Sequence, residues 1–286
     1  MTGRALAATF DAATASLVVL SAGADDRSLV TVVAPAGPQE PVELGGTATA
    51  LAVDGEGRAF LATRVGYFRF DVATGDLTKV DIDDQGGVDF TAIARRSDGR
   101  LVLGSADGAV YTLASDTTVG AQLKIFARVD VVVTQGNTAV VLDRGQTSVT
   151  SLNNEGTSSE HALRAGEGAT TMAADPAGRV LVADTRGGEL LVYGVNPLIL
   201  RQRYPVPDSP YGLTGSGPGN GLAWVAQTAT NTVIGYDLST GIPVEKVRYP
   251  TVQQPNTLAF DDASGTLYVV SGVGAGVQVI PKAARP

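Results

Sequence analysis

One motif recurs along the whole chain and limits what the chain can fold into. It consists of a short apolar run, a turn rich in Gly and Asp, and a second apolar run. The clearest copy is GRVLVADTRGGELLVY, in which Arg179–Ala183 and Glu189–Tyr193 predict two strands around the turn Asp184–Gly188. The first of these two strands recurs at regular intervals, beginning at Ser16, Arg58, Arg100, Thr138, Arg179, Gly221 and Thr266.

The length of the repeat identifies the architecture. Seven copies at a period of about 40 to 45 residues match the four-stranded blades of a β-propeller. Helical repeats of this length would place apolar residues at i, i+3 and i+4, whereas these segments are short continuous or alternating apolar runs bounded by Gly, Asp and Asn. We therefore predict an all-β fold, a seven-bladed β-propeller of four-stranded antiparallel blades, with residues 1–286 forming a single domain.

Each copy begins with a strand of small and branched residues, such as Thr47–Asp54 or Ala169–Asp175. Such a strand suits the innermost position, where blades crowd together and bulky side chains do not fit. A more polar fourth strand, such as LTKVDI or PVEKVRYP, would complete each blade.

The two ends of the repeat differ from the rest. The last copy stops at Ile280 after its third strand, which predicts a three-stranded last blade with an open edge. The first copy starts directly on its inner strand, Arg4–Phe10. An N-terminal segment often supplies the strand that a last blade lacks, so we expect Met1 to be an artificial start.

The composition of the chain excludes several classes of function. The formal net charge of −8 argues against nucleic-acid binding, which needs a basic surface to neutralise phosphates. The absence of cysteine excludes disulfides, thiolate catalysis and thiolate metal sites. No apolar stretch approaches the length of a membrane span, and no signal peptide is visible.

Three other features favour structural roles. The single histidine, His161, falls in an outer strand, where we expect it to be solvated and unsuited to a catalytic triad or a zinc site. The acidic run from Asp81 to Asp89 begins like a calcium loop, but its twelfth position is Ala92, so we expect a surface turn. Trp224 lies within an apolar strand and is expected in the core. We predict no catalytic residue, no metal site and no cofactor.

The candidate binding residues come from propeller geometry. The start of the first strand and the loop between the second and third strands are expected at the same end of each blade, where they would rim a central channel. We expect a partner or ligand to contact this rim through Arg64, Asp89, Asp107, Asp143, Arg144, Asp184, Arg186, Tyr211, Asn231 and Asn256. Arginine holds carboxylates or phosphates with paired N–H groups, and asparagine and tyrosine orient polar ligands. In the alternative interpretation these residues cap turns, because an aspartate that ends a strand often accepts hydrogen bonds from loop amides.

Copies six and seven contain N-T-V-x-x-x-D-x-x-T-G, from Asn231 to Gly241, followed by P-N-x-L-A-F from Pro255. This pattern resembles the YVTN-type and NHL-type propeller repeats. The resemblance implies that Asp237 and Gly241 form a scaffold turn between the third and fourth strands.

A further resemblance is to the mycobacterial LppL-type lipoproteins, and it covers most of the chain from about Leu51. It is carried by DFTAIARRSDGRLVLGSADGAVYTL, GEGATTMAADPAGRVLVADTRGGELLVYGVNPLILRQ and GIPVEKVRYPTVQQPNTLAFD. The resemblance implies an exported protein anchored to the outer side of the cytoplasmic membrane by a lipid on an N-terminal cysteine. This chain contains no such cysteine, so we expect that the anchor has been removed. The family offers no catalytic residues to carry over.

Three functional hypotheses follow. The first is a monomeric, non-enzymatic scaffold of the cell envelope that binds an envelope protein or a small ligand through the rim. The second is a metal-dependent, lactonase-like hydrolase with Asp89, Asp184, Asn231 and Asn256 facing the channel, although it lacks a suitably placed inner-strand glutamate. The third is an architectural module whose open blade edge assembles with another chain.

Overall fold

The computed structural model describes residues 3–217 and 221–284, and Met1 lies outside this part. The described residues form 28 strands and no helix. Contacts among the described residues define two compact units, residues 6–162 and residues 163–284 together with residues 3–5.

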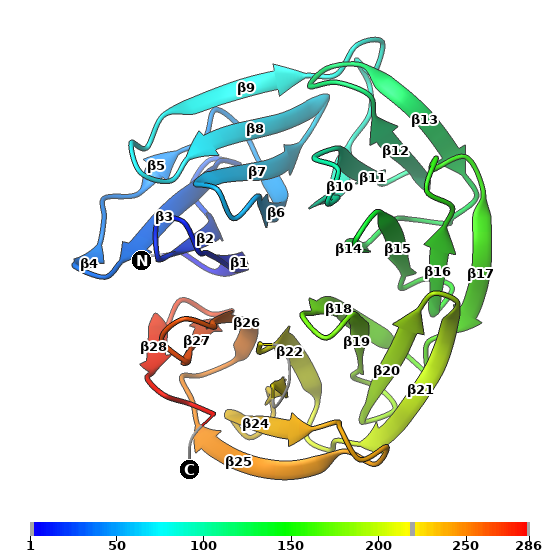
Figure 1. Cartoon of the computed structure of the whole chain (residues 1–286). Helices are drawn as coiled ribbons and strands as arrows, with labels where there is room; N and C mark the ends of the chain where they lie inside the picture. Colours follow the sequence, from blue (N-terminus) through cyan, green and yellow to red (C-terminus); the bar gives the residue numbers. More distant parts are fainter. Residues whose placement is uncertain (1–2, 218–220, 285–286) are drawn as a thin grey trace. The chain divides into compact units, whose positions relative to one another are not determined.

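The first unit contains four blades, each a separate antiparallel sheet whose strands follow chain order, except that the fifth strand of the first blade pairs with its third (Figure 1). Their strands are β1 (Ala5–Asp11), β2 (Ser16–Ala22), β3 (Ser28–Ala34), β4 (Gly37–Pro38) and β5 (Val42–Glu43); β6 (Ala48–Val53), β7 (Arg58–Thr63), β8 (Gly66–Asp71) and β9 (Leu77–Asp81); β10 (Phe90–Arg95), β11 (Leu101–Ser105), β12 (Ala109–Leu113) and β13 (Val119–Lys124); β14 (Val131–Gln135), β15 (Thr138–Asp143), β16 (Ser148–Leu152) and β17 (Ser159–Arg164).

The second unit contains three blades built in the same way. Their strands are β18 (Ala169–Asp175), β19 (Arg179–Asp184), β20 (Glu189–Val195) and β21 (Leu198–Pro205); β22 (Pro210–Gly215), β23 (Leu222–Gln227), β24 (Thr232–Asp237) and β25 (Val244–Pro250); β26 (Pro255–Asp261), β27 (Thr266–Ser271) and β28 (Val277–Ile280). The prediction of seven blades, with three strands in the last, is confirmed.

The first blade departs from the simple pattern because its outer strand is broken. β4 pairs with one end of β3 through Val33 and Pro38, and β5 pairs with the other end through Leu29 and Glu43. Proline has no backbone N–H to donate, so Pro38 and Pro41 interrupt what would otherwise be one continuous fourth strand.

The hydrophobic core of each unit lies between neighbouring blades. One cluster joins Leu61 and Phe68 of the second blade to the first, and another joins Tyr67 of the second blade to Phe90 of the third. β8 therefore buries both of its faces, which explains why apolar residues occupy successive positions of this strand. Trp224 is fully buried between blades six and seven, which confirms its expected place in the core.

Candidate functional site

Every blade brings the start of its first strand next to the end of its second. Ala169 pairs with Asp184 in blade five, and Pro255 pairs with Ser271 in blade seven. We call this the leading end of a blade, and the end that carries the turn between the first two strands its trailing end. The predicted rim residues lie at or near the leading ends of their blades.

Asp143 and Asp184 occupy the same position in blades four and five, as the last residue of the second strand, and both are completely buried. The Asp184 carboxylate accepts hydrogen bonds from the backbone N–H groups of Glu167 at 2.7 Å, Gly168 at 2.8 Å and Gly187 at 2.9 Å. Asp143 accepts them from Ala127 at 2.8 Å and Gln146 at 3.0 Å. These carboxylates therefore hold the loops of the leading end in place.

The arginines that follow these aspartates lie at the surface, whereas the aspartates are buried. Arg144 and Arg186 are exposed, as is Arg64 in blade two. Among the described residues, none of the three guanidinium groups forms an ion pair. The Arg186 side chain lies over Gly168, where a Cβ atom would come within 2.8 Å of the arginine Cβ. Each unit thus presents uncompensated positive charge at leading ends of its blades.

In the first unit, backbone hydrogen bonds join blades two and three at this end. Arg64 and Asp89 form an isolated antiparallel bridge, and the N–H of Val65 donates to the carbonyl of Val88 at 2.8 Å. The Asp89 side chain is exposed, whereas Asp107 forms an ion pair with Lys124 at 2.6 Å. Hydrogen bonds from Lys124 and then Ser105 lower the pKa of Asp107.

The remaining candidates lie in the second unit and contribute mainly to its structure. The Oδ1 atom of Asn231 accepts a hydrogen bond from the N–H of Gln254 at 2.8 Å, which ties blade six to the segment leading into blade seven. Asn256 lies against Gly272, and its buried Oδ1 atom has no partner among the described residues. Tyr211 is half-buried in β22 and accepts a hydrogen bond from Thr171 through its backbone carbonyl.

The residues with predicted structural roles lie where expected. His161 is exposed on β17, and Asp81–Asp89 forms a surface turn in which Asp83 accepts hydrogen bonds from two threonines. Gly241 takes a positive φ of 82° in the turn that follows β24. Of the residues assigned to the hydrolase alternative, Asp184 and Asn231 use side-chain oxygens to hold backbone N–H groups.

Sequence reasoning missed several polar residues at the leading ends. Arg128 forms an ion pair with Asp130 at 3.2 Å, and Asp130 also accepts the N–H of Arg144 at 2.8 Å. Glu167 is exposed beside the loop held by Asp184. No repeat position marks these residues, because they lie in connecting segments of varying length.

Within residues 3–217 and 221–284, no group of three or more His, Asp or Glu side chains is arranged to hold a metal ion. The same part of the chain contains no helix with the length and apolar character that membrane crossing requires.

Sequence comparisons give no relative of this chain: no protein-family model matches it, and no curated protein does. Solved structures do match. The structure of U3-55K shares 10% sequence identity over 98% of this chain and 96% of that chain, with a TM-score of 0.81. The RRP9 WD40 repeats share 11% identity over 98% and 95%, also with a TM-score of 0.81. Hydrazine synthase from Kuenenia stuttgartiensis shares 14% identity over 99% and 97%, with a TM-score of 0.79. At these identities the likeness concerns the fold alone, and this chain is a seven-bladed β-propeller.

Proposed function

We propose that this chain is a non-enzymatic scaffold of the cell envelope that binds a partner protein through arginines at the leading ends of its blades. The observation that carries the proposal is a repeated pair. In blades four and five, a fully buried aspartate fixes the loop between the second and third strands, and an exposed arginine without an ion pair follows it. The aspartates hold the loops, and the arginines make the contact.

The chemistry of the contact follows from the guanidinium group. Arginine binds carboxylates and phosphates through two parallel N–H donors, and a rigid loop lowers the entropy lost on binding. Arg144 and Arg186 are therefore suited to acidic side chains of a partner. Arg64 supplies a third such group in blade two.

The cellular location rests on the resemblance to the LppL-type lipoproteins. In this proposal the chain is the exported part of a protein that a lipid on an N-terminal cysteine anchors to the cytoplasmic membrane. Fractionation of the source cells with an antibody against this chain tests the location. Recovery in the membrane fraction, released by detergent, supports the anchor, and recovery in the cytosol contradicts it.

Binding is tested by capture from a detergent-solubilised envelope fraction on the immobilised chain. We expect R144A/R186A to lose specific captured proteins while keeping the unfolding midpoint of the unchanged chain. The matched control is R58A/R100A, because Arg58 and Arg100 are exposed arginines at the trailing ends of blades two and three. The proposal is wrong if R144A/R186A captures the same proteins as the unchanged chain.

A further inference from the structure

A second polar site lies in the second unit, between blades five and six. It is a depression with a volume of about 330 Å³. Its floor contains the buried side chains of Val192 and Leu238, and its polar lining includes Arg179, Arg201 and Gln202. The volume falls at the lower end of the range for small-molecule sites.

Arg201 supplies the net positive charge of this depression. It is the extra residue of a β-bulge, because Val192 pairs with Gln202 while the next residue, Tyr193, pairs with Leu200. A bulge redirects a side chain relative to regular pairing. The guanidinium lies over Gly194, where a Cβ atom would come within 2.8 Å of the arginine Nε atom. A bulge and a glycine together position this group.

Arg179 in the depression and Lys246 at the equivalent bulge of blade six both form ion pairs, whereas Arg201 does not. Arg179 forms an ion pair with Asp175 through two hydrogen bonds to Oδ2, at 3.0 and 2.6 Å. Lys246, the bulge residue of blade six, lies 3.4 Å from Asp237. Among the described residues, Arg201 has no carboxylate within ion-pair distance. An anionic ligand would supply the negative partner that Arg201 lacks among the described residues.

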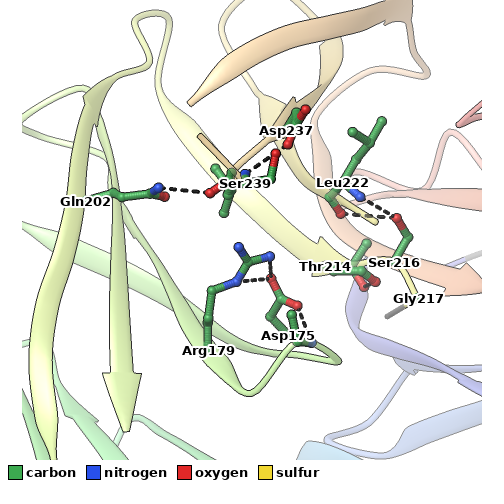
Figure 2. A network of polar contacts seen from close by, with 12 residues as sticks. Asp175, Arg179, Gln202, Thr214, Ser216, Gly217, Leu222, Asp237 and Ser239 are labelled. Carbon is green, nitrogen blue, oxygen red and sulfur yellow. Dashed lines mark hydrogen bonds and ion pairs between the residues drawn. The ribbon is translucent and has the colours of Figure 1, made fainter. Parts of the chain in front are cut away.

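Gln202 adds a second requirement, which is that the ligand carries a hydrogen-bond donor. Its Nε2 atom donates to the carbonyl of Leu238 at 3.0 Å, which fixes the orientation of the amide; Figure 2 shows this contact and, nearby, the Arg179–Asp175 pair. The Oε1 atom is buried and has no partner among the described residues. Because an unsatisfied buried acceptor is costly, a shift of this side chain toward the depression would let a ligand N–H group satisfy the Oε1 atom.

We propose that this depression binds small carboxylates with an adjacent amide N–H group, as found in an N-acylated amino acid and at the C-terminal residue of a peptide. The carboxylate pairs with Arg201, the N–H donates to Oε1 of Gln202, and an aliphatic side chain covers Val192 and Leu238. The site involves trailing-end turns of blades five and six, so it is separate from Arg186 at the leading end of blade five.

Three related probes test this chemistry by ligand-observed NMR and calorimetry. We expect N-acetyl-L-leucine to bind. N-acetyl-L-leucinamide, which lacks the carboxylate, and 4-methylpentanoate, which lacks the N–H, should each bind at least about tenfold more weakly. Equal binding of the leucinamide, or no binding of N-acetyl-L-leucine, overturns the proposal.

Variants of the chain locate the site. R201Q should weaken N-acetyl-L-leucine binding by at least about tenfold. G194A should weaken it without changing the unfolding midpoint, because the added methyl group displaces only the end of a flexible side chain. The matched control is R203Q on the same strand, since Arg203 is exposed and already paired with Glu189 at 2.7 Å. Unchanged binding in R201Q, or an equal loss in R203Q, overturns the proposal.

The two sources of this chemistry are separated by one further probe, an acetylated pentapeptide that ends in leucine. Tighter binding of the pentapeptide than of N-acetyl-L-leucine supports the site as one for the C-terminus of a protein chain. Equal affinity supports it as one for free N-acylated amino acids. Loss of both in R201Q is required in either case.

Discussion

The carboxylate of Asp184 accepts a hydrogen bond from the backbone N–H of Glu167 at 2.7 Å, so the end of β19 is tied to the segment that leads into β18. The same carboxylate holds the loop that follows β19 through Gly187. One buried side chain thus fixes both segments at the leading end of blade five. A Cβ atom at Gly166 or Gly187 would lie within 2.2 Å of Asp184 Oδ2, which shows how closely these loops surround it.

Removing this carboxylate should destabilise the chain strongly. In Asp184→Ala three backbone N–H groups would lose their acceptor, and we expect the free energy of unfolding to fall by about 3 kcal/mol or more. Urea denaturation measures the change. The control is Asp89→Ala, whose exposed carboxylate should change stability by less than about 0.5 kcal/mol. Equal effects in the two variants would show that Asp184 does not hold the loops.

The strands could be predicted from the sequence because each blade repeats the same local pattern. The predicted strand Arg179–Ala183 is β19, Arg179–Asp184, and the predicted strand Thr47–Asp54 is β6, Ala48–Val53. Alternating or continuous apolar runs between turn residues specify such strands without long-range information. The broken outer strand of the first blade was not anticipated, since it depends on how two prolines lie along β3.

The candidate sites could be predicted only in part. The repeat identifies the loops that carry Asp143 and Asp184, but not that their carboxylates are buried and saturated by loop amides. That outcome depends on the path of the segment preceding each blade. The depression beside Arg201 was missed, because the direction of the Arg201 guanidinium depends on a β-bulge. No residue type in the sequence indicates where that bulge forms. Arg201 and Arg203 are indistinguishable in the sequence LILRQRYP.

Replacing one glycine in the core of the first unit with a larger residue should destabilise the chain. At Gly104 in β11, a Cβ atom would lie 2.0 Å from Cγ1 of the fully buried Val129. Gly104→Ala should therefore lower the free energy of unfolding by about 1 to 3 kcal/mol, because the core has no room for another methyl group. Gly86→Ala is the control, since Gly86 is exposed and nothing lies near its Cβ position. A neutral Gly104→Ala variant would mean that blades three and four pack more loosely than the structure shows.

The single tryptophan should report on the packing of blades six and seven. Trp224 is fully buried and stacks on Tyr249 and Phe260, with ring centroids 6.4 and 6.0 Å away. We expect Trp224→Ala to cost about 3 to 5 kcal/mol of unfolding free energy, as is usual for large aromatic side chains in cores. Trp224→Phe should cost less, since it keeps an aromatic ring and removes a buried Nε1–H that has no partner among the described residues. Thermal unfolding of both variants checks this order, and the reverse order would contradict it.

Three buried tyrosines should make the chain sensitive to alkali. Burial, and to a smaller extent a nearby carboxylate, raises the pKa of Tyr67, Tyr193 and Tyr236 to about 12 from the usual tyrosine value of 10.0. The Tyr67 hydroxyl also donates to the carbonyl of Asp116 at 3.0 Å, so the neutral phenol is the form that the fold accommodates.

The pH dependence follows from which state holds the proton. Between pH 10 and pH 12 the folded chain keeps these phenolic protons and the unfolded chain loses them. The free energy of unfolding that the tyrosines contribute below pH 10 is therefore lost as the pH rises from 10 to 12. Each such tyrosine contributes a slope of about 1.4 kcal/mol per pH unit at most. In Tyr67→Phe one contribution disappears, and urea denaturation across the window should show a shallower decline than in the unchanged chain. Measurements near neutral pH provide the control, because there the two proteins differ only by the lost hydrogen bond and its packing. Parallel declines in the alkaline window would show that Tyr67 does not couple its proton to folding.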